Sequence, residues 1–121
     1  MKSHWIFYKG VRIFLADFSN YVSDGAGIKA ETQHIIGLLK NEPDHSVLSL
    51  STVDGTFANE DILQALTELV PISNKKVKRR AVIGVSGFRR HFLDAFAAVI
   101  GNVKFSVFDT HEEACDWLVK P

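Results

Sequence analysis

Apolar residues gather in short runs along this chain, and the runs predict the strands of a sheet. The first two runs, residues 5–8 and 11–16, are separated only by Lys9-Gly10, and a two-residue connection that ends in Gly is typical of a hairpin. The later runs are apolar and in part β-branched, as expected for strands buried inside a sheet. They cover residues 47–50, 81–85 and 103–108.

Elsewhere the apolar residues recur every three or four positions, which is the spacing of a helix with one buried face. The predicted helices cover residues 28–39, 60–70, 88–100 and 111–118. Each of three helices follows a residue type that caps helix N-termini: Ser23 or Asp24, then Asn59, then Thr110. Thr110 also has Glu113 three residues later, which matches a capping box.

Pro71 marks the expected end of the second helix, because proline lacks the N–H that continues a helix and clashes with the preceding turn. Residues 73–80 are then expected to form a basic connection that leads into the strand at residues 81–85.

The resulting order is β-β-α-β-α-β-α-β-α, which predicts an α/β fold. Strands that alternate with helices imply parallel crossovers, so the sheet is expected to be mixed and mostly parallel, opened by one antiparallel hairpin. The length of 121 residues fits one domain, residues 1–121, and the 46% of hydrophobic residues suffices for a core. No apolar run approaches the roughly 20 residues of a membrane span, and the N-terminus does not resemble a secretory signal.

Charge is balanced overall but unevenly distributed. The chain has 14 basic and 14 acidic residues, so no bulk attraction to nucleic acid is expected. Seven of the basic residues lie between Lys75 and Arg90. The single cysteine, Cys115, cannot form an internal disulfide, which fits a reducing compartment, and a cytoplasmic location is expected.

Two strings resemble the STAS-like domains of bacteria, the group that includes anti-sigma-factor antagonists. They are Val82-Ile83-Gly84-Val85-Ser86-Gly87 before a helix and Phe108-Asp109-Thr110-x-Glu112-Glu113-Ala114-x-x-Trp117-Leu118 at the end of the chain. The resemblance covers nearly the whole chain and is to small single-domain members, which are grouped loosely with the lipid-binding CRAL-TRIO fold. It implies a signalling or interaction module, in some cases one that binds a nucleotide or lipid.

Antagonists of this group carry a phosphorylated Ser at the start of the helix after the central strand. The matching place in this chain is Thr56-Phe57-Ala58-Asn59-Glu60, which contains no Ser. The resemblance therefore does not extend to a phosphorylation switch.

The candidate ligand site is the start of the helix that follows residues 81–85, with Ser86, Gly87, Arg89 and Arg90 as its residues. Backbone N–H groups at a helix start and two guanidinium groups can hold a phosphate or carboxylate. The alternative interpretation is that Ser86 only caps the helix and both arginines are solvated.

Two further clusters have a functional and a structural interpretation. The basic residues from Lys75 to Arg80 can bind an acidic partner or an anionic lipid headgroup, or they can be a solvated loop that protects the following strand from aggregation. Five phenylalanines of the C-terminal third can line a pocket for an acyl chain, or they can be ordinary core. These are Phe88, Phe92, Phe96, Phe105 and Phe108.

We therefore expect a non-enzymatic binding or signalling module that recognises a protein partner or a small anionic or amphipathic, lipid-like ligand. No catalytic set can be assembled, and no cofactor or metal is expected, because the five histidines and Cys115 lack ligand spacing. One alternative is a small enzyme acting on a phosphorylated or carboxylated substrate, with Asp17, Asp54 or His91 near Ser86. Another is a homodimer that pairs through the hairpin edge at residues 5–8.

Overall fold

The structure is a computed structural model that describes residues 1–57, 59–85 and 105–121. Its elements follow the predicted order of strands and helices. They are β1 (His4–Tyr8), β2 (Val11–Asp17), α1 (Gly25–Leu39), β3 (Val47–Thr52), α2 (Glu60–Lys76), β4 (Val77–Ile83), β5 (Ser106–Val107) and α4 (His111–Leu118). The predicted helix at residues 88–100 lies outside the described residues.

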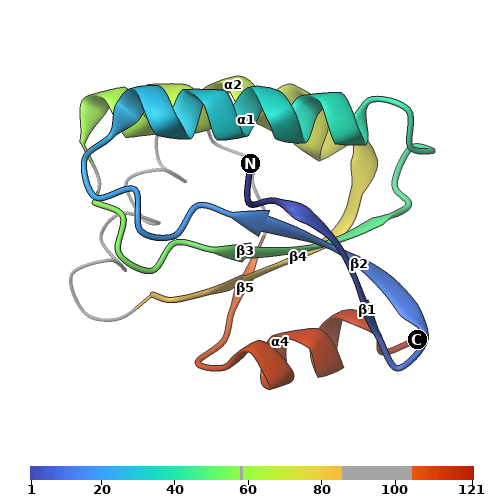
Figure 1. Ribbon diagram of the computed structural model, residues 1–121. Coiled ribbons are helices and arrows are strands. Elements are labelled where there is room, and N and C mark those ends of the chain that lie inside the picture. The colour runs from blue at the N-terminus through green and yellow to red at the C-terminus, as the bar shows by residue number, and fades with distance from the viewer. Residues whose placement is uncertain (58, 86–104) are drawn as a thin grey trace.

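The strands form one sheet in the order β1-β2-β3-β4-β5. The β1–β2 pair is antiparallel, and the three other pairs are parallel. Figure 1 shows α1 and α2 side by side over one face of the sheet and α4 under the other face. The predicted mixed α/β sheet, opened by a hairpin, is therefore confirmed. Among the described residues, no helix has the length and hydropathy to cross a membrane.

The β1–β2 hairpin is closed by a two-residue turn. Lys9 and Gly10 both have positive φ, 50° and 79°, and Tyr8 lies opposite Val11. Positive φ at both central residues is the signature of a type I′ turn, whose twist matches that of the two strands. The tip is held against α4 by Asp116, which accepts from Tyr8 Oη at 2.7 Å and from Lys9 Nζ at 3.0 Å. The hydrogen bond to Asp116 raises the pKa of Tyr8 to about 12.

The predicted N-caps hold three helices at their first turn. The Asp24 carboxylate accepts from Gly27 N at 2.9 Å, and Asn59 Oδ1 accepts from Ile62 N at 2.8 Å. Thr110 Oγ1 accepts from Glu113 N at 3.1 Å, and it donates to the Glu113 carboxylate at 3.1 Å. Each cap satisfies a backbone N–H that has no partner within its helix.

The expected end of α2 at Pro71 is wrong, because the helix continues through Pro71 to Lys76. Proline removes one hydrogen bond, but tertiary contacts hold the last turn in place. Ile72 packs against the core, and the buried Lys76 donates to Asp44 Oδ1 at 3.0 Å and to the Glu42 carbonyl at 2.6 Å. The expected basic connection at residues 73–80 is also wrong, since α2 leads directly into β4 at Val77.

Each face of the sheet covers its own group of buried residues. Phe14 and Val82 belong to the group under α1 and α2, together with Ile35 and Ile62 of these helices. Ile13 and Leu50 belong to the group between the sheet and α4. Ile13 directly precedes Phe14 in the sequence, so the two residues point to opposite faces. This is the alternation that a strand covered on both faces requires.

Candidate functional site

The central strand β3 presents small polar side chains to α1 and α2. Ser49 and Ser51 alternate with Leu48 and Leu50, and Leu50 is fully buried against α4. The register places Ser49 between Phe14 and Arg80 on the neighbouring strands. A hydroxymethyl group fills far less space than the leucines of the opposite face, so the sheet leaves room under the two helices.

That room is a partly open cavity of about 80 Å³ between the sheet and the helices α1 and α2. A single buried water needs only about 15 Å³. The wall is mostly apolar: the sheet contributes Phe14, Ala16 and Val82, and Phe105 lies just before β5. The helices contribute Ile35, Leu39, Leu66, Leu69 and Val70.

Arg80 provides a positive charge on the wall of this mostly apolar cavity. It lies on β4 beside Ser49, and its guanidinium donates to Ser73 Oγ of α2. Burial lowers the pKa of Arg80. The group still stays charged at neutral pH, because the guanidinium starts from a pKa above 12. An anion beside Arg80 would therefore meet a cation in a medium that screens it poorly.

A second, more polar cleft of about 520 Å³ adjoins the cavity along β4. Four residues line both spaces: Asn74, Val77, Arg80 and Phe105. The wall of the cleft is rich in groups that carry positive charge. Lys78 and Arg79 are the cationic residues beside Arg80, and His45, Ser106 and Trp117 also line the cleft.

The residues of the predicted basic patch therefore make different contacts. Lys76 is buried on Asp44, and Arg79 donates to the carbonyls of Trp117 and Lys120 at 3.2 and 2.6 Å at the end of α4. Lys78 lines the cleft, and Arg80, which donates to Ser73 Oγ, lines both the cleft and the cavity. Strand alternation separates Arg79 from Arg80, because β4 points them to opposite faces of the sheet.

The predicted site residues Ser86, Gly87, Arg89 and Arg90 lie outside the described residues, and so do Phe88, Phe92 and Phe96. The two other phenylalanines are on different faces of the sheet. Phe105 lines the cavity under α1 and α2. Phe108 packs against Trp117 of α4, with the ring centroids 5.4 Å apart. Of these two, only Phe105 fits the predicted apolar pocket.

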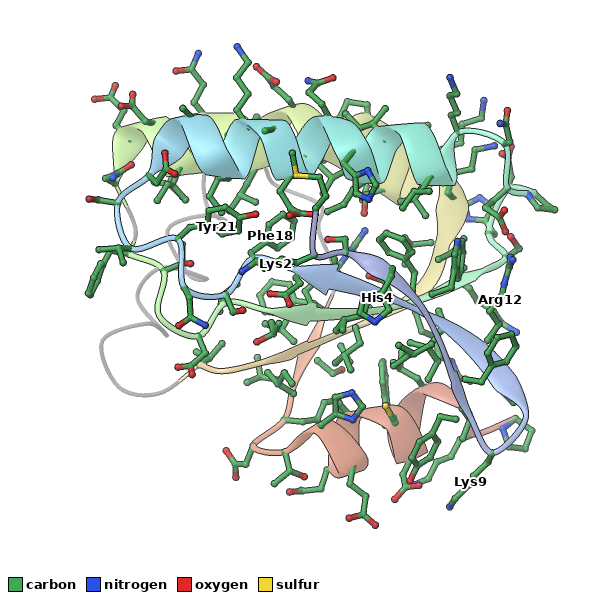
Figure 2. The ribbon with its side chains drawn as sticks, in the orientation of Figure 1. Lys2, His4, Lys9, Arg12, Phe18 and Tyr21 are labelled. Atoms are coloured by element: carbon green, nitrogen blue, oxygen red, sulfur yellow. The ribbon has the colours of Figure 1, made fainter. Side chains whose placement is uncertain are left out.

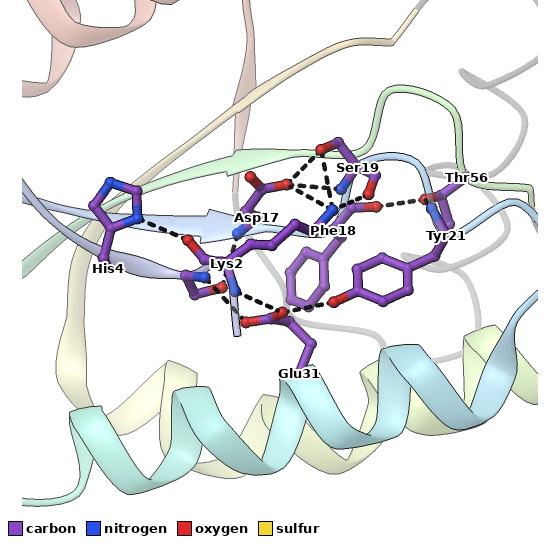
Figure 3. A network of polar contacts seen from close by, with 9 residues as sticks. Lys2, His4, Asp17, Phe18, Ser19, Tyr21, Glu31 and Thr56 are labelled. Carbon is purple, nitrogen blue, oxygen red and sulfur yellow. Dashed lines mark hydrogen bonds and ion pairs between the residues drawn. The ribbon is translucent and has the colours of Figure 1, made fainter.

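A polar network joins the N-terminus to α1, as Figure 3 shows. The buried carboxylate of Glu31 accepts from the backbone N–H groups of Lys2 and Ser3 at 3.2 and 3.1 Å, and from Tyr21 Oη at 2.6 Å. Burial works to raise the pKa of Glu31, but these hydrogen bonds outweigh it, so the pKa lies below its ordinary value. Such a satisfied carboxylate is a structural anchor, and the sequence pattern did not reveal it.

Asp17, one of the predicted acid–base candidates, belongs to the same network. Its carboxylate accepts from Ser19 N at 3.0 Å and lies 3.5 Å from Lys2 Nζ. Burial works to raise the pKa of Asp17, but the bonds from Ser19 and Lys2 hold it below its ordinary value. The Asp17 carboxylate is therefore ionised at neutral pH and already bound by Ser19 and Lys2, which does not suit a residue that must accept and release a proton. His91 and Ser86, the other residues of the enzyme hypothesis, lie outside the described residues.

Two other residues with potentially reactive side chains have structural roles. Cys115 is fully buried, and burial raises the pKa of its thiol, so the reactive thiolate is disfavoured. Asp24 is occupied as the cap of α1. Within the described ranges, no three His, Cys, Asp or Glu side chains form a group that could hold a metal ion.

Comparison with known proteins supports the architecture rather than a named activity. No family model and no curated protein matches the sequence. A solved structure does match: an uncharacterised protein of the DUF3478 family, with a SpoIIAA-like fold, from Shewanella loihica PV-4. The alignment covers 96% of this chain and 91% of that chain, with a TM-score of 0.70 and 15% sequence identity.

This chain has a SpoIIAA-like fold. The STAS-like architecture predicted from the sequence is thereby confirmed, whereas the low identity extends the likeness to the fold alone.

The stretch where the resemblance places the phospho-acceptor, residues 56–60, has one hydroxyl side chain. Thr56 is the hydroxyl residue of that stretch, and it is 3% exposed. Its Oγ1 donates to the Phe18 carbonyl and accepts from Tyr21 N at 3.1 Å. A kinase cannot reach a buried hydroxyl that already forms two hydrogen bonds, so Thr56 does not replace the missing Ser.

Proposed function

We propose that this protein is a non-enzymatic binding module for a small amphipathic anion. The ligand's apolar end occupies the cavity under α1 and α2, and its carboxylate or phosphate lies at Arg80. The observation that carries the proposal is the charge of Arg80 on a wall that is otherwise formed mainly by aliphatic and aromatic side chains.

The chemistry of the two spaces supports an amphipathic ligand over a purely polar one. Small-molecule sites are mostly apolar, with a few polar groups that fix orientation. The cavity supplies the apolar part, and the adjoining cleft, with Lys78 and Arg79 on its wall, supplies positive charge near the anionic end. A guanidinium can bind a carboxylate or phosphate through two parallel hydrogen bonds.

The size of the cavity limits the apolar end of the ligand. An engineered apolar cavity of about 150 Å³ holds a benzene ring, so a cavity of about 80 Å³ suits a short segment of alkyl chain. The affinity of straight-chain carboxylates should therefore rise with chain length and then level off once the cavity is filled.

Calorimetric titration with hexanoate, octanoate and decanoate, each beside the alcohol of equal length, tests this proposal. We expect saturable binding in which each carboxylate exceeds its alcohol by about tenfold, the value of one charge-assisted hydrogen bond. Arg80→Gln should remove this advantage, and Arg80→Lys should restore part of it. Arg12→Gln is the matched control, because Arg12 lies on β2 outside both spaces.

Binding that is absent for the whole series, or equally weakened by Arg80→Gln and Arg12→Gln, would contradict the proposal. Native mass spectrometry of protein purified gently from its own cells offers an independent check. A bound mass identifies the ligand class directly.

The residues predicted from sequence stay part of the proposal. Ser86, Gly87, Arg89 and Arg90 follow β4 along the chain, after Arg80. A double variant, Arg89→Ala with Arg90→Ala, belongs in the same titrations. A loss of the carboxylate advantage assigns them to the anion site, and an unchanged affinity removes them from it.

A protein partner is the second candidate, and it is favoured by two exposed apolar residues beside the loop where the STAS resemblance places the phospho-acceptor. Val22 and Phe57 are 54% and 45% exposed, and Phe57 N donates to the Val22 carbonyl at 2.7 Å. Val22 has φ 55°, a strained conformation for a β-branched residue. A photo-crosslinking residue at position 57 should capture a partner in cells, and Val22→Asp should prevent the capture.

A further inference from the structure

The first strand, β1, forms one edge of the sheet and lacks the usual protection of an edge strand. It comes first in the strand order, and β2 is its neighbour. Its five residues, His4–Tyr8, include no Lys, Arg, Asp, Glu or Pro, and its register with β2 is regular throughout. Natural edge strands are commonly protected by such charges, by proline or by bulges, because an open edge can pair with another chain.

The hairpin turn determines which backbone groups of β1 face outward. In a two-residue type I′ hairpin, the residues that flank the turn form a hydrogen-bonded pair, and such pairs then alternate along the ladder. Tyr8, Ile6 and His4 therefore bond to β2. The N–H and C=O groups of Trp5 and Phe7 point away from the sheet, where a further strand would lie.

Apolar side chains lie along this edge on both faces of the sheet, next to His4 and Tyr8 on the face toward α4. Phe7 is 72% exposed. Trp5, on the same face, packs edge-to-face on Phe14 at a centroid distance of 5.0 Å, with the Arg12 guanidinium 3.8 Å from its ring. Ile6 faces α4 and packs against the core there. An added strand would therefore meet apolar partners on either face.

The charges at the two ends of β1 are already paired within the chain. Lys2 Nζ lies 3.5 Å from Asp17, and Lys9 Nζ lies 3.0 Å from Asp116. Figure 2 shows Lys2 and Lys9 at opposite ends of the strand. They are therefore poorly placed to repel a second strand along the edge.

We propose that β1 pairs antiparallel with β1 of a second copy of this chain, about a twofold axis at Ile6. In this register Trp5 lies opposite Phe7 of the partner subunit, and Ile6 lies opposite Ile6 of the partner subunit. The outward backbone groups of Trp5 and Phe7 then form two hydrogen-bonded pairs, and two Trp–Phe contacts form on one face. The occupant is a second copy because the strand is complementary to itself in this register.

The pairing is independent of the proposed ligand site. No residue of β1 lines the cavity or the cleft. Arg80 and the cleft lie along β4, although Phe14 and Ala16 of β2, the neighbour of β1, contribute to the wall of the cavity. A dimer built through β1 leaves both spaces accessible. Failure of the dimer would therefore leave the ligand proposal standing, and the reverse also holds.

Sedimentation equilibrium of the intact chain over a hundredfold range of concentration is the first test. Since a five-residue edge buries little area, we expect a weak dimer whose average mass rises with concentration. Phe7→Pro should hold the mass at the monomer value, because it removes an outward N–H and no bond to β2. Phe7→Lys should do the same by placing charge on the edge. Gln33→Lys on the exposed face of α1 adds the same charge and should dimerise like the native chain.

Cysteine crosslinking tests the register. In a Cys115→Ala background, which removes the native thiol from the core beside Ile6, Ile6→Cys should give a covalent dimer on mild oxidation. Opposed residues of a non-hydrogen-bonded pair lie about 4.5 Å apart, within disulfide range. Phe7→Cys should not crosslink, because its copies are displaced by two residues along the strands.

A constant monomer mass for the native chain, or dimers unaffected by Phe7→Pro and Phe7→Lys, would overturn the proposal. Crosslinking through Phe7→Cys and not through Ile6→Cys would overturn the register. Circular dichroism of each variant establishes that a lost dimer is not a lost fold.

Discussion

The two faces of the sheet are built from alternate residues of the same strands, yet they are filled very differently. On the face toward α4, Ile13, Leu50 and Ala81 lie against Ala114 and Leu118, and each of these five residues is at most 1% exposed. Large aliphatic side chains at the centre and small ones at the contact with the helix leave little space there. This face resembles an ordinary protein core.

On the face toward α1 and α2, the same strands contribute Ser49, Ser51 and Arg80. Two hydroxymethyl groups and a partly buried cation replace what would otherwise be aliphatic volume, and a cavity remains. A protein that only needed stability would gain from filling it with apolar side chains. The comparison indicates that the α4 face supports the fold and that the other face contains the proposed site.

The largest expected effect on stability comes from shortening one leucine to alanine on each side of the sheet. Leu50→Ala should lower the free energy of unfolding by about 4 kcal/mol, because it opens a new void in a filled core. Leu66→Ala should cost about 2 kcal/mol, because Leu66 already borders the cavity and loses fewer contacts. Urea unfolding of both variants measures the difference. Equal losses would mean that the two faces are packed alike.

The local features of this fold were predictable from sequence because neighbouring residues determine them. The caps at Asp24, Asn59 and Thr110 need only a side-chain oxygen near the first turn. Lys9-Gly10 needs only two residues that tolerate positive φ. The error at Pro71 had a tertiary cause: Lys76 reaches Asp44 and Glu42, more than 30 residues away, and these bonds hold the end of α2.

The site was less predictable, because its residues come together through strand register. The alternation of Ser49 and Ser51 with Leu48 and Leu50 was visible in the sequence, and it was the available signal for an unfilled face. Arg80 was recognised as basic but assigned to a loop, since the strand was expected to begin at residue 81. Glu31 and its partners gave no signal, because the backbone N–H groups it binds lie at the N-terminus.

A substitution at Glu31 tests whether hydrogen bonds stabilise the α1 side of the molecule, which is less closely packed than the α4 side. Glu31→Gln should lower the free energy of unfolding by about 2 kcal/mol at pH 7, because an amide leaves one of the three donors without an acceptor. Glu68→Gln, the same exchange at an exposed position on α2, should change it by less than about 0.5 kcal/mol. Urea unfolding measures both, and equal effects would contradict the anchoring role.

The pH dependence of the same variant gives a second readout. The pKa of Glu31 is lowered in the folded state, so its contribution is complete above the ordinary value of 4.5 and is lost as the pH falls through the folded value. The difference in stability between the native chain and Glu31→Gln should therefore narrow as the pH falls below 4.5. A gap that stays constant down to pH 3 would mean that the ionised form contributes nothing.

The smallest change in stability should come from filling the cavity itself. Ser51 lies between Ala16 and Val82 in the register of the sheet, so Ser51→Val adds two methyl groups to an apolar wall in a residue type that strands favour. We expect the free energy of unfolding to change by less than about 1 kcal/mol. The affinity for decanoate should nevertheless fall by about tenfold, because the added methyl groups occupy the space for its apolar end. Thr52→Val, the next residue on the opposite face, should leave the affinity unchanged. If Ser51→Val binds decanoate like the native chain, the apolar end lies elsewhere, and the unfilled face is a packing defect instead of a site.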